Sequence, residues 1–160
     1  MSKFRVPFRM HVSGWVLVVF CGLIGIRFSG LWPGLVLGGS IVASLLLHEL
    51  GHILASAALG VPVCEFGLCL RGAYNCRSTA CRRRDNILIS SAGPLVNLCL
   101  VATMILPVIG PKLAFCNLLL CVTNLLPLPS SDGMHILRSL FSSSRPASVN
   151  PVLSEASSSQ

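Results

Sequence analysis

The 160-residue sequence has few charged residues: Asp, Glu, Lys and Arg make up 11% of it, and only 5 residues are acidic. Soluble domains contain roughly 25% charged residues, so this chain cannot form the charged shell of a cytosolic enzyme. The same composition argues against a disordered chain and a secreted disulfide-rich module. Apolar residues are abundant instead, at 53%, and the mean hydropathy is +0.79. These values predict an integral membrane protein with a single domain.

Aromatic residues are also scarce near the basic ones, which argues against nucleic-acid binding despite a net charge of +7. The basic clusters contain only Phe4, Phe8, Tyr74 and Phe141, too few aromatic side chains for a row of stacking platforms. The basic residues lie mainly in residues 3–9, 71–84 and 138–145, between or beyond the apolar runs. The positive-inside rule places all three clusters on one side of a membrane. We therefore expect a multi-pass protein of the cell membrane with both termini in the cytoplasm.

Uncharged runs predict the fold class, an all-α polytopic membrane protein. Four transmembrane helices are expected, at about residues 12–30, 33–59, 86–109 and 113–128. A short β-hairpin is expected after the second helix, in the stretch Val61–Leu70 near Gly67 and Gly72.

Three segments follow from this pattern. Residues 1–11 form a basic cytoplasmic N-terminus, and residues 12–141 form the membrane domain. Residues 142–160 are rich in Ser and lack the apolar content to fold, so they are expected to be disordered.

Four of the eight cysteines lie in the predicted cytoplasmic loop. Cys64, Cys69, Cys76 and Cys81 have the spacing C-x4-C-x6-C-x4-C, whereas structural zinc sites favour closer pairs such as C-x2-C. A reducing cytoplasm disfavours disulfides between them. The spacing therefore favours free thiols and leaves metal binding by these four open.

The second predicted helix contains the sequence His48-Glu49-Leu50-Gly51-His52, an H-E-x-x-H motif. Two His residues four apart lie on one face of a helix and can bind one Zn²⁺, and the Glu can take a proton from the metal-bound water. Chance alone would give roughly 0.002 such motifs in a chain of this composition. An ionisable cluster inside a spanning helix is functional by default, because burying it in lipid costs roughly 3 kcal/mol per charge.

Catalytic zinc needs a third protein ligand, and the sequence offers few candidates. Glu155 lies in the tail, and Glu65 and Asp85 lie in the basic loop, where pairing with Arg is expected. Asp132 follows the last apolar run, after a proline-rich segment that opens the helical backbone. Asp132 is preferred over His135, because His₂-carboxylate sets recur in hydrolytic zinc sites. The expected cofactor is one Zn²⁺ per chain.

Three segments together resemble the site-2 protease family of intramembrane zinc metalloproteases. They are the HELGH helix, the Ala92-Gly93-Pro94-Leu95-Val96-Asn97 stretch, and the segment with Asn124, Pro127, Pro129, Asp132 and Gly133, in this order. The resemblance covers about residues 31–140. The sequence departs from the family pattern at Ser130, Ser131 and Met134, which surround the expected ligand and leave it intact.

The resemblance implies regulated intramembrane proteolysis with zinc bound by His48, His52 and Asp132 and with Glu49 as general base. It implies that Asn97 and Asn124 position substrate, although both can equally serve as interhelical hydrogen-bonding residues. The expected partners are a transmembrane protein substrate, the lipid bilayer and a regulatory membrane protein. A compact form is expected, without the PDZ or CBS domain of other members.

Two rival interpretations are weaker. Membrane zinc peptidases of another type use a downstream Glu ligand on a helix, and the last Glu here, Glu155, lies in the tail. A non-catalytic membrane scaffold or metal-binding protein would use the same ligands without turnover. It would gain nothing from Glu49, which makes an enzyme the favoured interpretation.

Overall fold

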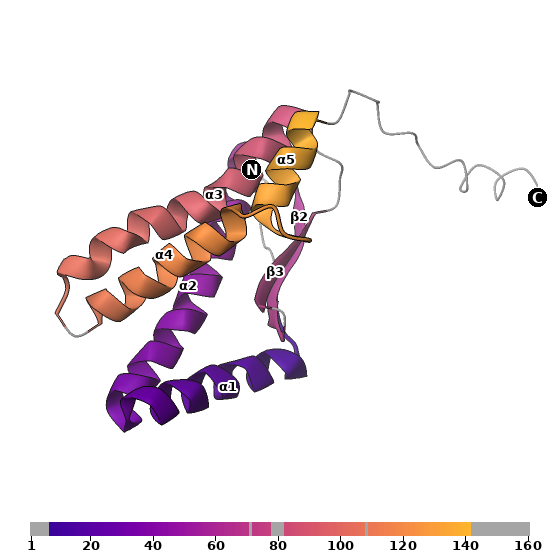
Figure 1. The fold of residues 1–160 in the computed structure, drawn as a ribbon. Coiled ribbons are helices and arrows are strands. Elements are labelled where there is room, and N and C mark those ends of the chain that lie inside the picture. Colours follow the sequence, from indigo (N-terminus) through magenta and orange to yellow (C-terminus); the bar gives the residue numbers. More distant parts are fainter. Residues whose placement is uncertain (1–6, 71, 78–81, 108, 142–160) are drawn as a thin grey trace, which may run out of the picture.

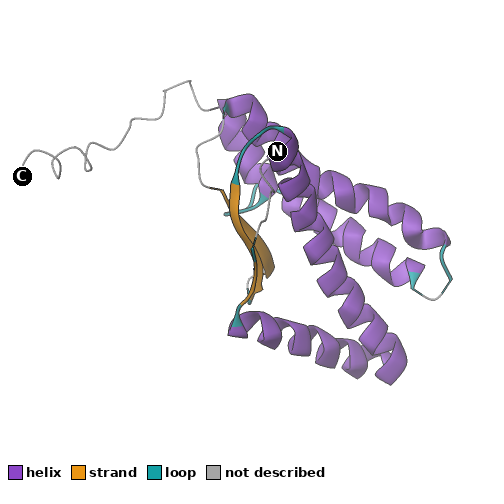
Figure 2. Ribbon diagram, turned by 180° about the vertical axis from the view of Figure 1, so that it is seen from behind, coloured by secondary structure: helices purple, strands orange, loops and turns teal. Residues whose placement is uncertain are grey.

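The computed structural model describes residues 7–70, 72–77, 82–107 and 109–141. Most of them are helical (Figures 1 and 2). The expected tail at 142–160, the first six residues and Cys81 lie outside the described part. The helices are α1 (Val12–Ser29), α2 (Leu31–Ala58), α3 (Arg83–Leu100), the 3₁₀ helix η1 (Val101–Ile105), α4 (Gly110–Leu125) and α5 (Asp132–Phe141). The strands are β1 (Phe8–Met10), β2 (Val63–Cys69) and β3 (Gly72–Arg77).

Three helical segments are long and apolar enough to cross a membrane: α1, α2, and α3 together with η1. The fourth, α4, is apolar but has only 16 residues, or about 24 Å, which is less than the roughly 30 Å of a hydrocarbon core. It ends at Leu125, three residues before the expected end, because Leu126 is already extended ahead of Pro127. The predicted membrane fold is therefore confirmed, with three full-length spans and one shorter apolar helix.

The four longest helices form two pairs (Figure 1). α1 and α2 meet in a V at Gly30, and α3 and α4 run side by side as an antiparallel pair. Glycines on both helices allow the backbones of α1 and α2 to approach closely. A Cβ added at Gly38 would lie 2.9 Å from the Cα of Gly22, and one added at Gly34 would overlap the backbone of Gly25. Only residues without side chains permit this approach, and small residues are the usual contact between membrane helices.

A small sheet spans the open side of the V (Figure 2). The hairpin expected near Gly67 and Gly72 is confirmed as the antiparallel pair β2 and β3. A third strand, β1, pairs in parallel with β2 and gives the order β1-β2-β3. The sequence analysis placed residues 8–10 in a basic N-terminal segment and did not predict this strand. Parallel pairing with residues more than fifty positions away leaves no local pattern to detect.

Polar side chains fasten β1 to the hairpin. Nε of Arg9 lies 3.4 Å from Oε2 of Glu65, and the hydroxyl of Tyr74 donates to Oε1 of Glu65 at 2.5 Å. This hydrogen bond raises the pKa of Tyr74 to about 12, so Tyr74 stays protonated. Nε2 of His11, 2.8 Å from the same hydroxyl, then donates to it. The pairing of Glu65 with an Arg agrees with the expected role of this acid.

The last helix, α5, lies within a region for which the sequence analysis predicted no helix. Oγ of Ser131 accepts a hydrogen bond from the backbone N–H of Met134 at 3.2 Å, which is the N-cap contact of a helix beginning at Asp132. Ser131 also accepts from the N–H of Leu128 at 3.2 Å and so closes the turn that precedes α5. This turn fixes where Asp132 stands relative to the membrane helices.

Candidate metal centre

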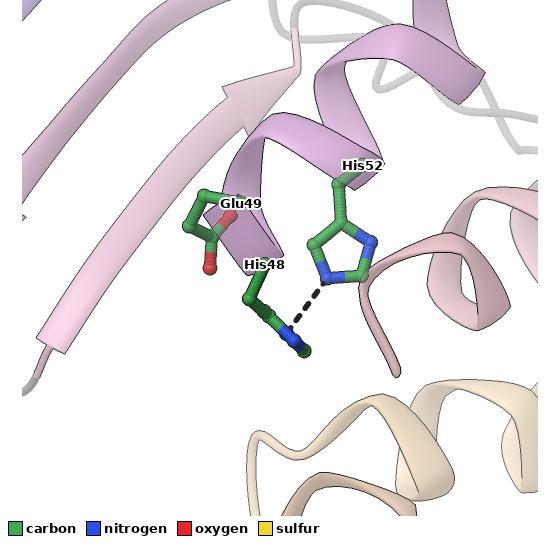
Figure 3. Close-up of side chains that lie close together, drawn as sticks. All are labelled: His48, Glu49 and His52. Atoms are coloured by element: carbon green, nitrogen blue, oxygen red, sulfur yellow. Dashed lines mark hydrogen bonds between the residues drawn. The ribbon is translucent and has the colours of Figure 1, made fainter. Parts of the chain in front are cut away.

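The H-E-x-x-H residues lie in the second half of α2 and point into the protein (Figure 3). His48, Glu49 and His52 are 5%, 9% and 4% exposed. The two Nε2 atoms face each other at 3.1 Å, as Figure 3 shows, and the imidazole planes meet nearly at right angles. One potential ligand atom from each of the three residues lies within 4.8 Å of the others. The helical spacing of the motif thus brings two imidazoles to one point.

Asp132, at the start of α5, completes this cluster. Its Oδ2 lies 3.0 Å from Nε2 of His48, and its Oδ1 lies 3.3 Å from Nε2 of His52. Burial alone would raise the pKa of Asp132, but the hydrogen bonds and charges of the two imidazoles outweigh it and lower this pKa to about 2. The carboxyl group is therefore ionised at neutral pH and needs no proton loss to bind a cation.

The three donor groups fit a zinc ion. A tetrahedral Zn²⁺ with bonds of about 2.0–2.1 Å separates its ligand atoms by roughly 3.3 Å. The observed separations among Nε2 of His48, Nε2 of His52 and the Asp132 oxygens are 3.0–3.3 Å. Two imidazoles and one carboxylate leave the fourth position of such an ion open to water, as in catalytic zinc sites.

His52 is oriented by the backbone of α3. Its Nδ1 donates to the carbonyl oxygen of Ile89 at 2.6 Å. In the neutral imidazole that a metal requires, the proton on Nδ1 leaves the lone pair on Nε2, the atom that faces Asp132. A backbone carbonyl behind a ligand His is a common way to set its tautomer and ring angle.

His48 is oriented by Asn97, which is fully buried in α3. The Asn97 amide lies 3.0 Å from Nδ1 of His48, and among the described residues its Oδ1 has no hydrogen-bond partner. A His that binds metal through Nε2 carries its proton on Nδ1. An Asn97 amide with Oδ1 turned toward this atom accepts that proton and no longer has an unpaired buried oxygen. The unpaired Oδ1 of Asn97 is therefore consistent with a His48 that carries its proton on Nδ1, as metal binding through Nε2 requires.

The Glu49 side chain extends toward the sheet, and one of its carboxylate oxygens stays within 4.8 Å of the imidazole nitrogens. The side-chain amide of Asn75 on β3 donates a hydrogen bond to Oε2 of Glu49. A cavity of about 210 Å³ opens beside both residues. Its lining comes from α2, β3 and the start of α5: Glu49, His52, Ala73, Tyr74, Asn75, Ser130, Asp132 and His135.

Gly93 lets α3 approach the imidazoles. A Cβ at this position would lie 2.6 Å from Cε1 of His52 and 2.7 Å from Cε1 of His48. Such contacts are too short, so only glycine fits without moving the rings. Gly93 belongs to one of the family motifs, but the motif alone does not indicate this packing role. Nothing in the sequence singles out Asn75 or Ile89, whose positions depend on tertiary packing that has no sequence signal.

The remaining sequence candidates occupy different places. His135 lines the cavity one turn after Asp132, and it is Asp132 whose oxygens reach the two Nε2 atoms. Asn124 lies in the last turn of α4 and is not among the cavity-lining residues, so its role stays a prediction. Cys64, Cys69 and Cys76 are free thiols in the sheet.

No family model matches the chain, whereas a curated protein and solved structures are similar to it. A protein of Synechocystis sp. (sll0528), provisionally named a zinc metalloprotease, is 32% identical over 168 residues, which is 87% of this chain and 42% of that protein. The chain thus spans less than half the length of this curated relative. The structure of Site-2 Protease from Methanocaldococcus jannaschii shares the fold with a TM-score of 0.70 and 24% identity. This match covers 88% of this chain and 69% of that one.

The helical membrane fold, shared with Site-2 Protease, brings His, Glu and Asp side chains together at one point, as a zinc site requires. The sequence match to a protein named as a zinc metalloprotease and the shared fold both support the resemblance to the site-2 protease family that the three motifs indicated.

Proposed function

We propose that the protein is a zinc-dependent endopeptidase that cleaves transmembrane segments of membrane-tethered substrates. The observation that carries this proposal is the convergence of His48, His52 and Asp132 at 3.0–3.3 Å, next to Glu49, on a helix apolar enough to span a membrane. The ligands come from α2 and α5, which are far apart in the sequence, and this makes an accidental cluster implausible. Hydrolysis of a peptide bond is the reaction that this set of groups performs in zinc proteases.

His48, His52 and Asp132 would hold the zinc ion. When bound, zinc lowers the pKa of a coordinated water toward about 7 and polarises a carbonyl oxygen. Glu49 takes the proton from the attacking water and returns it to the leaving nitrogen, so that the peptide bond breaks with no net change in its own protonation. Its Oε2 is held by the Asn75 amide, which leaves Oε1 to carry out the proton transfer.

A transmembrane substrate must unwind before it can be cut, because a helix hides its carbonyl groups in backbone hydrogen bonds. The edge of the sheet is suited to hold an unwound strand. β3 is an edge strand, and its residues Ala73–Asn75 line the cavity beside Glu49. Backbone pairing with this edge would bring an extended peptide alongside the proposed metal and general base.

The orientation of the chain in the membrane follows from its charges. We infer that the termini and the basic 71–84 loop face the cytoplasm, so that cleavage would release the cytoplasmic part of a substrate in regulated intramembrane proteolysis. A regulatory membrane partner is also expected, since an open cavity needs some control of access.

The variant Glu49→Gln tests this function. It keeps the shape and the hydrogen bond to Asn75 but cannot accept a proton, so we expect zinc to remain and cleavage to fall by about 10²–10⁴-fold. The measurement is cleavage of a co-expressed single-span reporter, alongside the zinc content of the purified protein. Cys99→Ser, at an exposed position outside the cavity, serves as a control that retains both. Undiminished cleavage in Glu49→Gln would show that Glu49 is not the base, and a wild type that binds zinc without cleaving any reporter would favour a non-catalytic scaffold.

A further inference from the structure

A second surface lies at the far end of α5 from Asp132. There, α5 turns three apolar side chains outward: Leu137, Leu140 and Phe141 are 39%, 48% and 80% exposed. Ser139, on the opposite side of the helix, is buried and accepts a hydrogen bond at 2.6 Å from the amide of Asn86 on α3. The helix is therefore amphipathic, with its polar contacts directed inward and its apolar side chains outward.

Arg83 contacts this end of α5, and three further arginines either neighbour Arg83 in the sequence or belong to α5. The guanidinium of Arg83 donates to the carbonyl oxygen of Leu140 and joins the start of α3 to the end of α5. Arg82 and Arg84 flank Arg83, and Arg138 lies on α5 itself. All four are exposed, and among the described residues Arg82, Arg84 and Arg138 form no salt bridge. We call Leu137, Leu140, Phe141, Arg82, Arg84 and Arg138 the α5 surface.

Basic residues outnumber acidic residues around the α5 surface. From Arg82 to the end of α3 there are three Arg and one acid, Asp85. The only acidic residue of α5 is Asp132, whose carboxylate contacts His48 and His52 at the other end of the helix. Arg138 lies in the last turn of α5. A ligand for the α5 surface must therefore be anionic and must also cover exposed apolar side chains.

We propose that the α5 surface binds the headgroups of anionic phospholipids. Its place in the fold supports this, because Arg83 is the first residue of a helix long and apolar enough to span a membrane. The α5 surface therefore lies at the level where such a helix leaves the hydrocarbon. Exposed Leu and Phe beside Arg is the composition of helices that lie in the membrane interface, with apolar side chains among acyl chains and cations on phosphates.

The proposal is tested on the full chain, purified in a mild non-ionic detergent and mixed with equal amounts of phosphatidylglycerol and phosphatidylcholine that have the same acyl chains. Native mass spectrometry measures which lipid stays bound. The wild type is expected to retain phosphatidylglycerol preferentially. Each basic residue near an anionic surface contributes a factor of about five, so Arg84→Gln/Arg138→Gln should lower this preference about 25-fold. Either single substitution should lower it about fivefold, which keeps the test open if the double variant does not fold.

The matched control removes the same charge elsewhere. Arg27→Gln/Lys112→Gln changes the last turn of α1 and the first turn of α4, and it should lower the lipid preference far less, because neither residue belongs to the α5 surface. Equal preference in Arg84→Gln/Arg138→Gln and in this control would overturn the proposal. A wild-type dimer that is lost in Phe141→Ser, with no lipid preference in any variant, would also overturn it and assign the surface to a second copy of the chain.

Discussion

The two ends of α2 are held in place by opposite means. At its N-terminal end, Gly34 and Gly38 bring the α2 backbone against the backbone of α1, and no polar side chain takes part in these contacts. At its C-terminal end, His48 and His52 are buried and each contacts a polar group on α3. One end depends on the absence of side chains, and the other depends on particular side chains with particular tautomers.

The glycine end of α2 therefore stabilises the fold, and the polar end of α2 provides the candidate metal ligands. In lipid, apolar side chains gain little from contact with each other, so close backbone packing at the glycine end holds α1 and α2 together. Buried polar groups are costly in lipid unless paired, and at the other end the pairing converges on one point that suits a metal ion. Substitutions at the glycine end should therefore damage the fold, and substitutions at the polar end should damage metal binding first.

The largest effect is expected at the glycine end. Gly34→Val would push a branched side chain into the Gly25 backbone and should destabilise the protein by about 3 kcal/mol or more. The measurement is thermal unfolding in detergent. Gly39→Val is the matched control, because nothing lies within 4 Å of a Cβ at Gly39. Equal melting temperatures for the two variants would show that the glycine contact does not hold the V together.

The next effect is expected where α3 meets the imidazoles. Gly93→Ala would place a methyl group 2.6–2.7 Å from the Cε1 atoms of His52 and His48 and rotate both rings. We expect zinc affinity to fall about 100-fold, as for other changes next to metal ligands, while the melting temperature of the zinc-free protein changes little. Gly39→Ala is the control. Unchanged zinc affinity in Gly93→Ala would show that the rings tolerate the methyl group without moving.

The smallest effect is expected at Asn97, which acts through His48. Asn97→Ala should lower zinc affinity about tenfold by releasing the ring. Asn97→Asp should retain the affinity, because a carboxylate also accepts the Nδ1 proton. Competition with a zinc chelator measures both. Loss of affinity in the Asp variant and not in the Ala variant would mean that Asn97 does not accept this proton.

The features that could be predicted from the sequence are local or compositional. His48 and His52 are one helical turn apart, so the spacing alone places them on one face, and long uncharged runs reveal the membrane helices. The sequence reduced the third ligand to Asp132 or His135, but only the turn closed by Ser131 decides which of them reaches the imidazoles. That turn also precedes α5. No helix was predicted there, because the neighbouring Ser and Pro residues are typical of a loop.

The features that could not be predicted depend on contacts between distant segments. β1 pairs with residues far along the chain, and Asn75 reaches Glu49 only because β3 lies against α2. Gly93 has no distinguishing neighbour in the sequence, and its importance appears only when α3 lies against both imidazoles. The boundary of α4 was misplaced because the uncharged run continues beyond Leu125, although the backbone is already extended at Leu126.

The central claim is that Asp132, and not His135, completes the metal centre with His48 and His52. The most direct test is the zinc content of purified wild type, Asp132→Ala and His135→Ala, measured after dialysis against the same chelator. We expect one zinc per chain in the wild type and in His135→Ala, and almost none in Asp132→Ala. Zinc that survives in Asp132→Ala and is lost in His135→Ala would contradict the proposed coordination.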